Sequence, residues 1–423
     1  MNEIKRTYAV IDGIHANAVP VMMYEPLHPG DKNHVGILLQ HSDDCYFEFT
    51  PALELAKRGY VVAVSYFPDH TIALDRKLEH VGKVAAYLRN YPGIEHLLLL
   101  GHSGGATLMS AYQAVAENGN AVFQDEDKII PLSDIAALPK ADAVIFLDAN
   151  FGNGVMTLLS LDPAVTREES GLQRNAALDL FNPDNGYDPE NCRYTDEFLR
   201  EYVSAQGRRM NHLIDYAKER VRVIDSGDGR FEDDEPMLIP GGTQIAPYNK
   251  IFPIYPQRFF SHTEEAWDLI RRDGSVQRDV VRCCRVKRNP QKGTQNYHDG
   301  TLRTTVRNFL NSYAVRTDHE LHYDETRLYG IDWDSSYCTG PGNVIHIEAP
   351  LLMMGMTGSY EYIAAEHLYR RAERSVDKTL AFVEGAGHNF TPALDAEQYP
   401  GEFGDTVKST FDYTDQWITQ RFI

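Results

Sequence analysis

The chain has 423 residues, 43% of them hydrophobic, and a formal net charge of −20, so it can bury a sizeable core as one large domain with an insertion or as two to three ordinary domains. The acidic balance argues against nucleic acid or an anionic membrane as a partner, because both recruit a basic face. No stretch approaches the ~20 apolar residues of a membrane span, and the amino-terminal segment lacks the apolar core of a signal peptide.

The first third of the chain predicts strands that alternate with helices. Two short strands, around Tyr8–Ile11 and Val19–Tyr24, are separated by a glycine-containing turn and are expected to form a hairpin. Further strands are expected at Val35–Gln40, Tyr60–Phe67, Leu97–Leu100 and Ala143–Leu147, with helices at Thr50–Gly59, at Leu74–Leu88 and from Gly104 onward. This alternation predicts a mostly parallel sheet with helices on both faces.

The alternation of strands and helices stops after Phe151 and resumes at Pro350. The intervening block carries a helical stretch that begins at a capping residue, Thr195, but it shows no strand–helix alternation. The strands and helices after it are expected at Leu351–Gly355, Tyr360–Ala372, Lys378–Val383 and from about Asp405. We therefore predict a core of residues 1–150 and 346–423. Residues 151–345 are predicted to form a cap, or lid, inserted between the sixth and seventh strands and lying over the strand ends where such sheets bind ligands.

A serine occupies the sharp bend between a buried strand and a helix. The stretch Leu97–Gln113 reads LLLLGHSGGATLMSAYQ and places Ser103 in a G-x-S-x-G pattern. A serine at such a bend projects its hydroxyl into a pocket. Gly101 and Gly105 allow a close helix–strand approach that a Cβ would block. The helix starts at Gly104, so the N–H of that residue is free to face a developing oxyanion.

These features resemble the α/β-hydrolase fold over about residues 5–150 and 345–420, with the cap outside the resemblance. In that family the nucleophile follows the fifth strand and a histidine follows the last one. Ser103 and His388 occupy those places, the latter in a glycine-rich loop. The resemblance implies that His388 accepts the serine proton during attack and returns it later. His102, beside the serine, is expected to pack away from the bend.

The carboxylate that orients the histidine has two candidates. The commonest family position lies about three residues after the glycine that ends the seventh strand, and Gly358 occupies it here. Asp148 ends the preceding strand, a position that some lipases and haloalkane dehalogenases of this fold use, and we favour it. Glu361 lies three residues beyond the vacant position and is the alternative.

The resemblance also implies an oxyanion hole built from two backbone N–H groups. One belongs to Gly104, and the other comes from the loop after the third strand. The family commonly has His-Gly in that loop, whereas this chain has His41-Ser42-Asp43. The alignment therefore assigns the second N–H to Asp43. Each such donor is worth roughly 3–4 kcal/mol of transition-state stabilisation.

Serine at the bend, rather than the aspartate of dehalogenases and epoxide hydrolases of this fold, implies an acyl-enzyme intermediate. The expected reaction is hydrolysis of a carboxylic ester or lactone of a medium-sized uncharged substrate, with no organic cofactor and no metal. A C–C bond hydrolase or an acyltransferase would use the same triad. A catalytically silent relative that only binds a ligand is the alternative of another class.

The number and spacing of the cysteines indicate the cellular compartment in which the protein works. The five are scattered and include no C-x-x-C pair: Cys45, Cys192, Cys283, Cys284 and Cys338. This usage indicates a reduced, cytoplasmic setting and no structural zinc site. We expect a small-molecule substrate, no nucleic acid and no membrane as partners, and the chain could form a homodimer.

Overall fold

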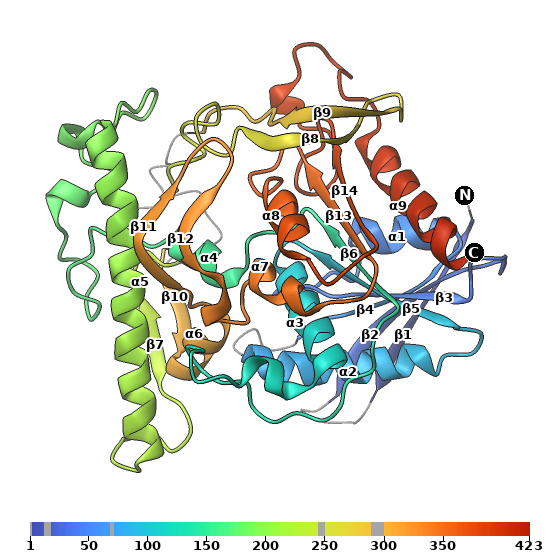
Figure 1. Cartoon of the computed structure of the whole chain (residues 1–423), viewed down its shortest axis with the longest axis horizontal. Helices are drawn as coiled ribbons and strands as arrows, with labels where there is room; N and C mark the ends of the chain where they lie inside the picture. The colour runs from blue at the N-terminus through green and yellow to red at the C-terminus, as the bar shows by residue number, and fades with distance from the viewer. Residues whose placement is uncertain (1, 12–17, 68–71, 244–249, 289–299) are drawn as a thin grey trace.

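The computed structural model describes residues 2–11, 18–67, 72–243, 250–288 and 300–423. Its central feature is a ten-stranded sheet in the order β1-β2-β4-β3-β5-β6-β13-β14-β8-β9 (Figure 1). The strands are β1 (Ile4–Ile11), β2 (Val19–Pro26), β3 (Val35–Leu39), β4 (Val61–Ser65), β5 (His96–His102), β6 (Ala143–Leu147), β8 (His262–Ile270), β9 (Val276–Arg282), β13 (Leu351–Met356) and β14 (Lys378–Val383).

Most of this sheet is parallel, as the sequence predicts. The strands from β4 to β8 in the sheet order pair in parallel, whereas β1–β2, β2–β4 and β8–β9 pair antiparallel. Every residue of β3, β4 and β6 is buried, which explains why these strands read as unbroken apolar runs instead of alternating patterns. The expected amino-terminal hairpin is confirmed in β1 and β2.

Helices cover both faces of the sheet, and the leucine run of β5 divides between the two layers. Leu97 and Leu99 belong to the hydrophobic core on the α2, α3 and α8 side, whereas Leu98 and Leu100 belong to the core on the α1 and α9 side. This division follows from the two-residue repeat of a strand. The helices are α1 (Thr50–Lys57), α2 (Leu74–Arg89), α3 (Gly104–Asn118), α8 (Ala364–Arg371) and α9 (Thr406–Phe422).

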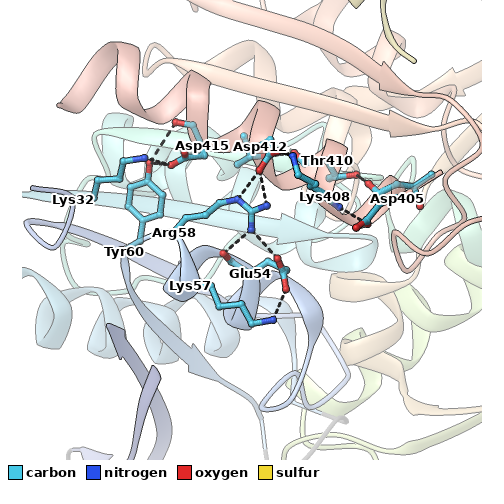
Figure 2. A network of polar contacts seen from close by, with 12 residues as sticks. Lys32, Glu54, Lys57, Arg58, Tyr60, Asp405, Lys408, Thr410, Asp412 and Asp415 are labelled. Atoms are coloured by element: carbon cyan, nitrogen blue, oxygen red, sulfur yellow. Dashed lines mark hydrogen bonds and ion pairs between the residues drawn. The ribbon is translucent and has the colours of Figure 1, made fainter. Parts of the chain in front are cut away.

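Ion pairs fasten the carboxy-terminal helix to the amino-terminal half of the core (Figure 2). Arg58, directly after α1, donates to Glu54 at 2.7 Å and to Asp412 of α9 at 2.7 Å. One turn further along α9, Asp415 accepts hydrogen bonds from Lys32 Nζ at 2.5 Å and from the Tyr60 hydroxyl at 2.6 Å. The contacts of Asp412 and Asp415 join segments more than 350 residues apart and hold α9 against its face of the sheet.

The middle of the chain forms a separate group of elements at the end of the molecule opposite the two termini (Figure 1). Its longest element is α5 (Asp196–Asp225). The expected N-cap residue of this helix is confirmed, because the Thr195 side chain accepts a hydrogen bond from the Phe198 N–H. No helix in the described part of the chain, α5 included, has the length and apolarity needed to cross a membrane. The other elements of this group are α4 (Asn153–Leu158), α6 (Val306–Ser312), and two small antiparallel sheets, β7 (Pro236–Ile239) with β10 (Leu302–Thr305) and β11 (Arg316–Tyr323) with β12 (Leu328–Asp332). The short helix α7 (Gly340–Asn343) lies against α3 and α8 of the core (Figure 1).

Two strands from the predicted cap domain (residues 151–345), β8 and β9, lie in the central sheet instead. β8 pairs in parallel with β14, and β9 returns antiparallel beside it as the outermost strand. An apolar pattern could not predict this hairpin, because its residues are largely polar, as in HTEEAWDLI, and β9 is mostly exposed. Charged residues are typical of edge strands, where they discourage pairing with other chains. For the remainder of residues 151–345, a role as cap stays a prediction.

Candidate active site

Ser103 lies on a strained turn between β5 and α3. Its backbone has φ 54° and ψ −125°, a region that a residue with a Cβ rarely adopts, and such outliers concentrate at functional sites. The flanking glycines are required by close packing. A Cβ on Gly101 would lie 2.6 Å from the carbonyl oxygen of Gly105, and one on Gly105 would lie 2.6 Å from the carbonyl oxygen of Gln40.

The structure brings His388 and the favoured carboxylate together. His388 follows β14, and its Nδ1 lies 2.6 Å from Oδ2 of Asp148. Asp148 follows β6 with a φ of 46° and is fully buried. Its other oxygen, Oδ1, accepts a hydrogen bond of 2.9 Å from the Met356 N–H at the end of β13. An ionised carboxylate can only accept, so Nδ1 of His388 carries the proton, and Nε2 of a neutral ring is left as the base.

The alternative carboxylate lies in the same cluster but contacts the serine. Ser103 Oγ donates to Glu361 Oε2 at 3.3 Å, and that oxygen is 3.7 Å from His388 Nδ1. The structure records no hydrogen bond between the described residues Ser103 and His388. Hydrogen bonds between a nucleophile and its base are often long before substrate binds. Both candidate carboxylates therefore lie at the site, and Asp148 is the one hydrogen-bonded to the imidazole.

The charges of this cluster shift the pKa values of its members. Burial alone would lower the pKa of His388, but the carboxylates of Glu361 and Asp148 raise it to about 9. The pKa of Glu361 is raised, mainly by burial and also by the negative charge of Asp148, although His388 and Lys250 oppose that shift. Burial lowers the pKa of the Lys250 ammonium to about 8. Closely packed groups of this kind with perturbed pKa values are typical of active sites.

His102 supports the loop of the other histidine, and its ring packs against the His388 ring with centroids 4.4 Å apart. Its expected orientation away from the bend stays a prediction. Its Nε2 lies 2.8 Å from the carbonyl oxygen of His388, and its Nδ1 lies 2.8 Å from the Tyr46 hydroxyl. Burial lowers the pKa of His102 well below its usual value, so the ring is neutral. A carbonyl oxygen only accepts, so Nε2 carries the proton and the Tyr46 O–H donates to Nδ1.

The loop after β3 differs from the expectation in its hydrogen bonding. The N–H of Asp43, which the alignment assigns to the oxyanion hole, donates to Nδ1 of His41 at 3.0 Å. The Asp43 carboxylate accepts from Ser42 Oγ at 2.5 Å and from Lys77 Nζ at 2.9 Å. Lys77 also donates to the Ser42 carbonyl at 2.7 Å and is only 1% exposed. Lys77 is not among the predicted site residues, although it lies on the buried face of α2.

Among the residues that the structure describes, two groups of side chains could hold a divalent cation. Within each group, atoms of suitable type lie within 4.8 Å of one another: Asp148 with Glu361 and His388, and His34 with Glu95 and His96. The first group coincides with the site described above, where a cation would compete with the proton on His388. That the reaction needs no metal stays a prediction.

The sequence matches no protein-family model and no curated protein. Solved structures that resemble it include Est1E from Butyrivibrio proteoclasticus, with 9% identity, a TM-score of 0.42 and coverage of 98% of both chains. The α/β hydrolase GrgF from Penicillium sp. sh18 has 11% identity, a TM-score of 0.44 and coverage of 98% of both chains. Brefeldin A esterase, described as a bacterial homologue of human hormone sensitive lipase, has 10% identity and a TM-score of 0.44 over 100% of this chain and 79% of that one.

The topology of the chain itself identifies its fold. Eight strands run in the order β1-β2-β4-β3-β5-β6-β13-β14, with an antiparallel start and a parallel remainder. Helices pack on both faces, and the serine lies at the turn that follows β5. These features together define the architecture: the chain has an α/β-hydrolase fold.

Proposed function

We propose that this protein is a serine hydrolase that cleaves a carboxylic ester or lactone through an acyl-enzyme intermediate. The observation that supports this most directly is the cluster at the carboxyl ends of β5, β6 and β14. A serine held at φ 54° lies beside a carboxylate that also approaches His388, and His388 is hydrogen-bonded to Asp148 at 2.6 Å. Nucleophile, base and orienting acid are the three groups that acyl transfer from a neutral serine requires.

In the proposed reaction, Ser103 Oγ attacks the carbonyl carbon and transfers its proton to Nε2 of His388. Asp148 keeps the Nδ1 proton in place and stabilises the imidazolium that forms. The oxyanion develops at the amino-terminal end of α3, where the Gly104 N–H can donate to it. The imidazolium then protonates the leaving alcohol, and a water molecule activated by the same histidine releases the acid.

The geometry favours Asp148 over Glu361 as the orienting acid. Nδ1 of His388 is 2.6 Å from the nearer Asp148 oxygen and 3.7 Å from the nearer Glu361 oxygen, and only the first distance is that of a hydrogen bond. Asp148 is also fixed through its second oxygen by the Met356 N–H. We therefore assign the orientation of the histidine to Asp148, and Glu361 affects the charge of the site.

The substrate we propose is uncharged and of medium size. The formal net charge of −20 disfavours a strongly anionic substrate. Aromatic side chains supply apolar surface nearby. Tyr360 precedes Glu361 and packs edge-on against Phe252, with ring centroids 6.1 Å apart. Tyr313 donates to Asp43 at 3.4 Å. Such mixed apolar and hydroxyl surroundings suit a neutral ester.

Kinetics with p-nitrophenyl acetate test the proposal. We expect a burst of p-nitrophenol equal to the enzyme concentration, followed by slower steady turnover, and we expect Ser103→Ala to abolish both without changing the thermal unfolding midpoint. Ser226→Ala, on the surface just after α5, is the matched control and should behave as wild type. Adding a primary alcohol distinguishes an acyltransferase, which would form a new ester. Retained turnover in Ser103→Ala would exclude the proposed nucleophile.

A further inference from the structure

Three polar side-chain atoms pack closely around Gly104 at the amino-terminal end of α3. A Cβ built on Gly104 would lie 2.6 Å from Ser42 Oγ, 3.0 Å from Asn153 Oδ1 and 3.2 Å from His41 Nε2, so a larger residue would collide with them. These atoms face the residue whose N–H is expected to hold the oxyanion, so their hydrogen-bonding character decides what the site can stabilise.

Two of the three atoms are acceptors. Ser42 Oγ donates its proton to Asp43 Oδ2 at 2.5 Å. Asn153, the first residue of α4, points Nδ2 towards Ser42 Oγ and Asp43 Oδ2, each at 3.3 Å, so its Oδ1 is the atom that faces Gly104. A negatively charged oxygen needs hydrogen-bond donors. Neither Ser42 nor Asn153 directs a hydrogen-bond donor towards Gly104 in the observed arrangement.

The third atom is a donor because the backbone fixes the tautomer of His41. The N–H groups of Asp43 and Asp44 donate to Nδ1 at 3.0 and 2.9 Å, so Nδ1 carries a lone pair and no proton. Burial lowers the pKa of His41, although the carboxylates of Asp43 and Asp44 oppose the shift. A neutral imidazole with a bare Nδ1 carries its proton on Nε2. Within the described part of the chain, no acceptor is hydrogen-bonded to that Nε2.

A lysine compensates the negative charge of Asp43, which lies in the same loop as His41. Lys77 Nζ lies 2.9 Å from Asp43 Oδ1, and the lysine also holds the Ser42 carbonyl. Burial alone would raise the pKa of Asp43, but the lysine and the bond from Ser42 lower it overall, so the two charges coexist as a pair. The pair fixes the loop without adding net charge next to the oxyanion.

We propose that Nε2–H of His41 donates to the oxyanion together with the Gly104 N–H. The Asp43 N–H serves this donor indirectly, because it occupies Nδ1 and so fixes the proton on Nε2. This inference rests on the proposed serine-hydrolase function. It makes His41 a catalytic residue through a side-chain donor, in place of the second backbone donor that the alignment assigns.

Two substitutions separate a donor from a structural support. His41→Asn places an amide oxygen near the position of Nδ1, so it can still accept from the loop, but it has no group at the position of Nε2. His41→Gln reaches the position of Nε2 with an amide N–H. If His41 donates to the oxyanion, Asn should be the damaging change and Gln the tolerated one. If His41 only holds the loop, the order should reverse.

The readout is the rate at which a fluorophosphonate labels Ser103, since its phosphoryl oxygen occupies the oxyanion hole. We expect His41→Asn to be labelled about 100- to 1,000-fold more slowly than wild type. We expect His41→Gln to be labelled within about tenfold of the wild-type rate, although the loss of the Nδ1 acceptor lowers its unfolding temperature, and His41→Asn to unfold at the wild-type temperature. Equal rates in the two variants, or a slower His41→Gln, would overturn the inference. A wild-type protein that is not labelled would instead remove the proposed function, and this inference with it.

Discussion

Glu361→Gln should move the pH dependence of the reaction to lower pH. Glu361 Oε2 lies 3.7 Å from His388 Nδ1. At an effective dielectric constant of about 20, this attraction amounts to about 4 kcal/mol, equivalent to about three pKa units. The carboxylate stabilises the charged imidazolium, so it contributes to the raised His388 pKa of about 9. Its removal must therefore lower that pKa.

The consequence for the rate follows from the protonation state that the mechanism needs. Only neutral His388 can accept the serine proton, and a pKa of about 9 leaves roughly 1% of the enzyme in that state at pH 7. Even two of these three units would bring the neutral fraction at pH 7 to roughly one half. We expect Glu361→Gln to be about tenfold or more faster than wild type at pH 7 and similar to it above pH 9.

The assay is kcat/KM for p-nitrophenyl acetate between pH 5.5 and 10, corrected for spontaneous hydrolysis. The wild-type rate should rise through a midpoint near pH 9, and that of Glu361→Gln through a midpoint between about pH 6 and pH 7. Glu373→Gln, which removes an exposed carboxylate just after α8, is the control and should leave the profile unchanged. A loss of several orders of magnitude at every pH in Glu361→Gln would show that Glu361, and not Asp148, orients the histidine.

Four further results are expected. Asp148→Asn should lower kcat about 10⁴-fold with little change in KM, because the amide favours the wrong tautomer of the histidine; a full rate would exclude Asp148. Lys77→Met should cost about 1–3 kcal/mol of unfolding free energy in urea titrations, because it removes the charged hydrogen bonds from Lys77 to half-buried Asp43 and to the Ser42 carbonyl; an unchanged midpoint would contradict the ion pair. Arg58→Ala should cost about 1–3 kcal/mol in the same titrations, because it removes charged hydrogen bonds to Asp412 and the end of α1. Dialysis against EDTA should leave turnover unchanged, and a loss restored by one divalent cation would require a metal.

The parallel core could be predicted because its strands are buried on both faces. Runs such as Val35–Leu39 and Ala143–Leu147 contain only residues that a sheet interior accepts, and the glycines around the bend mark its close packing. The β8–β9 hairpin could not be recognised from the same signal. Its exposed edge selects charged residues over an apolar pattern, and its partner strand β14 lies more than 100 residues further along the chain.

The site could be predicted only in part. Ser103 and His388 each stand in a local motif, but the choice between Asp148 and Glu361 depends on how the segment after β13 folds back, and no local pattern encodes that path. Lys77 did carry a signal, because it precedes Val81 by one helical turn and so lies on the apolar face of α2. The tautomer of His41 depends on hydrogen bonds within its own loop, and no sequence pattern indicates it.

The most direct test of the central claim is mass spectrometry of the acylated enzyme. The protein is mixed with p-nitrophenyl acetate, quenched in acid within the burst phase and digested for peptide mapping. We expect an added acetyl group on Ser103, together with its absence from the Ser103→Ala variant. An unmodified Ser103 during turnover, or the acetyl group on another residue with activity retained in Ser103→Ala, would contradict the proposed mechanism.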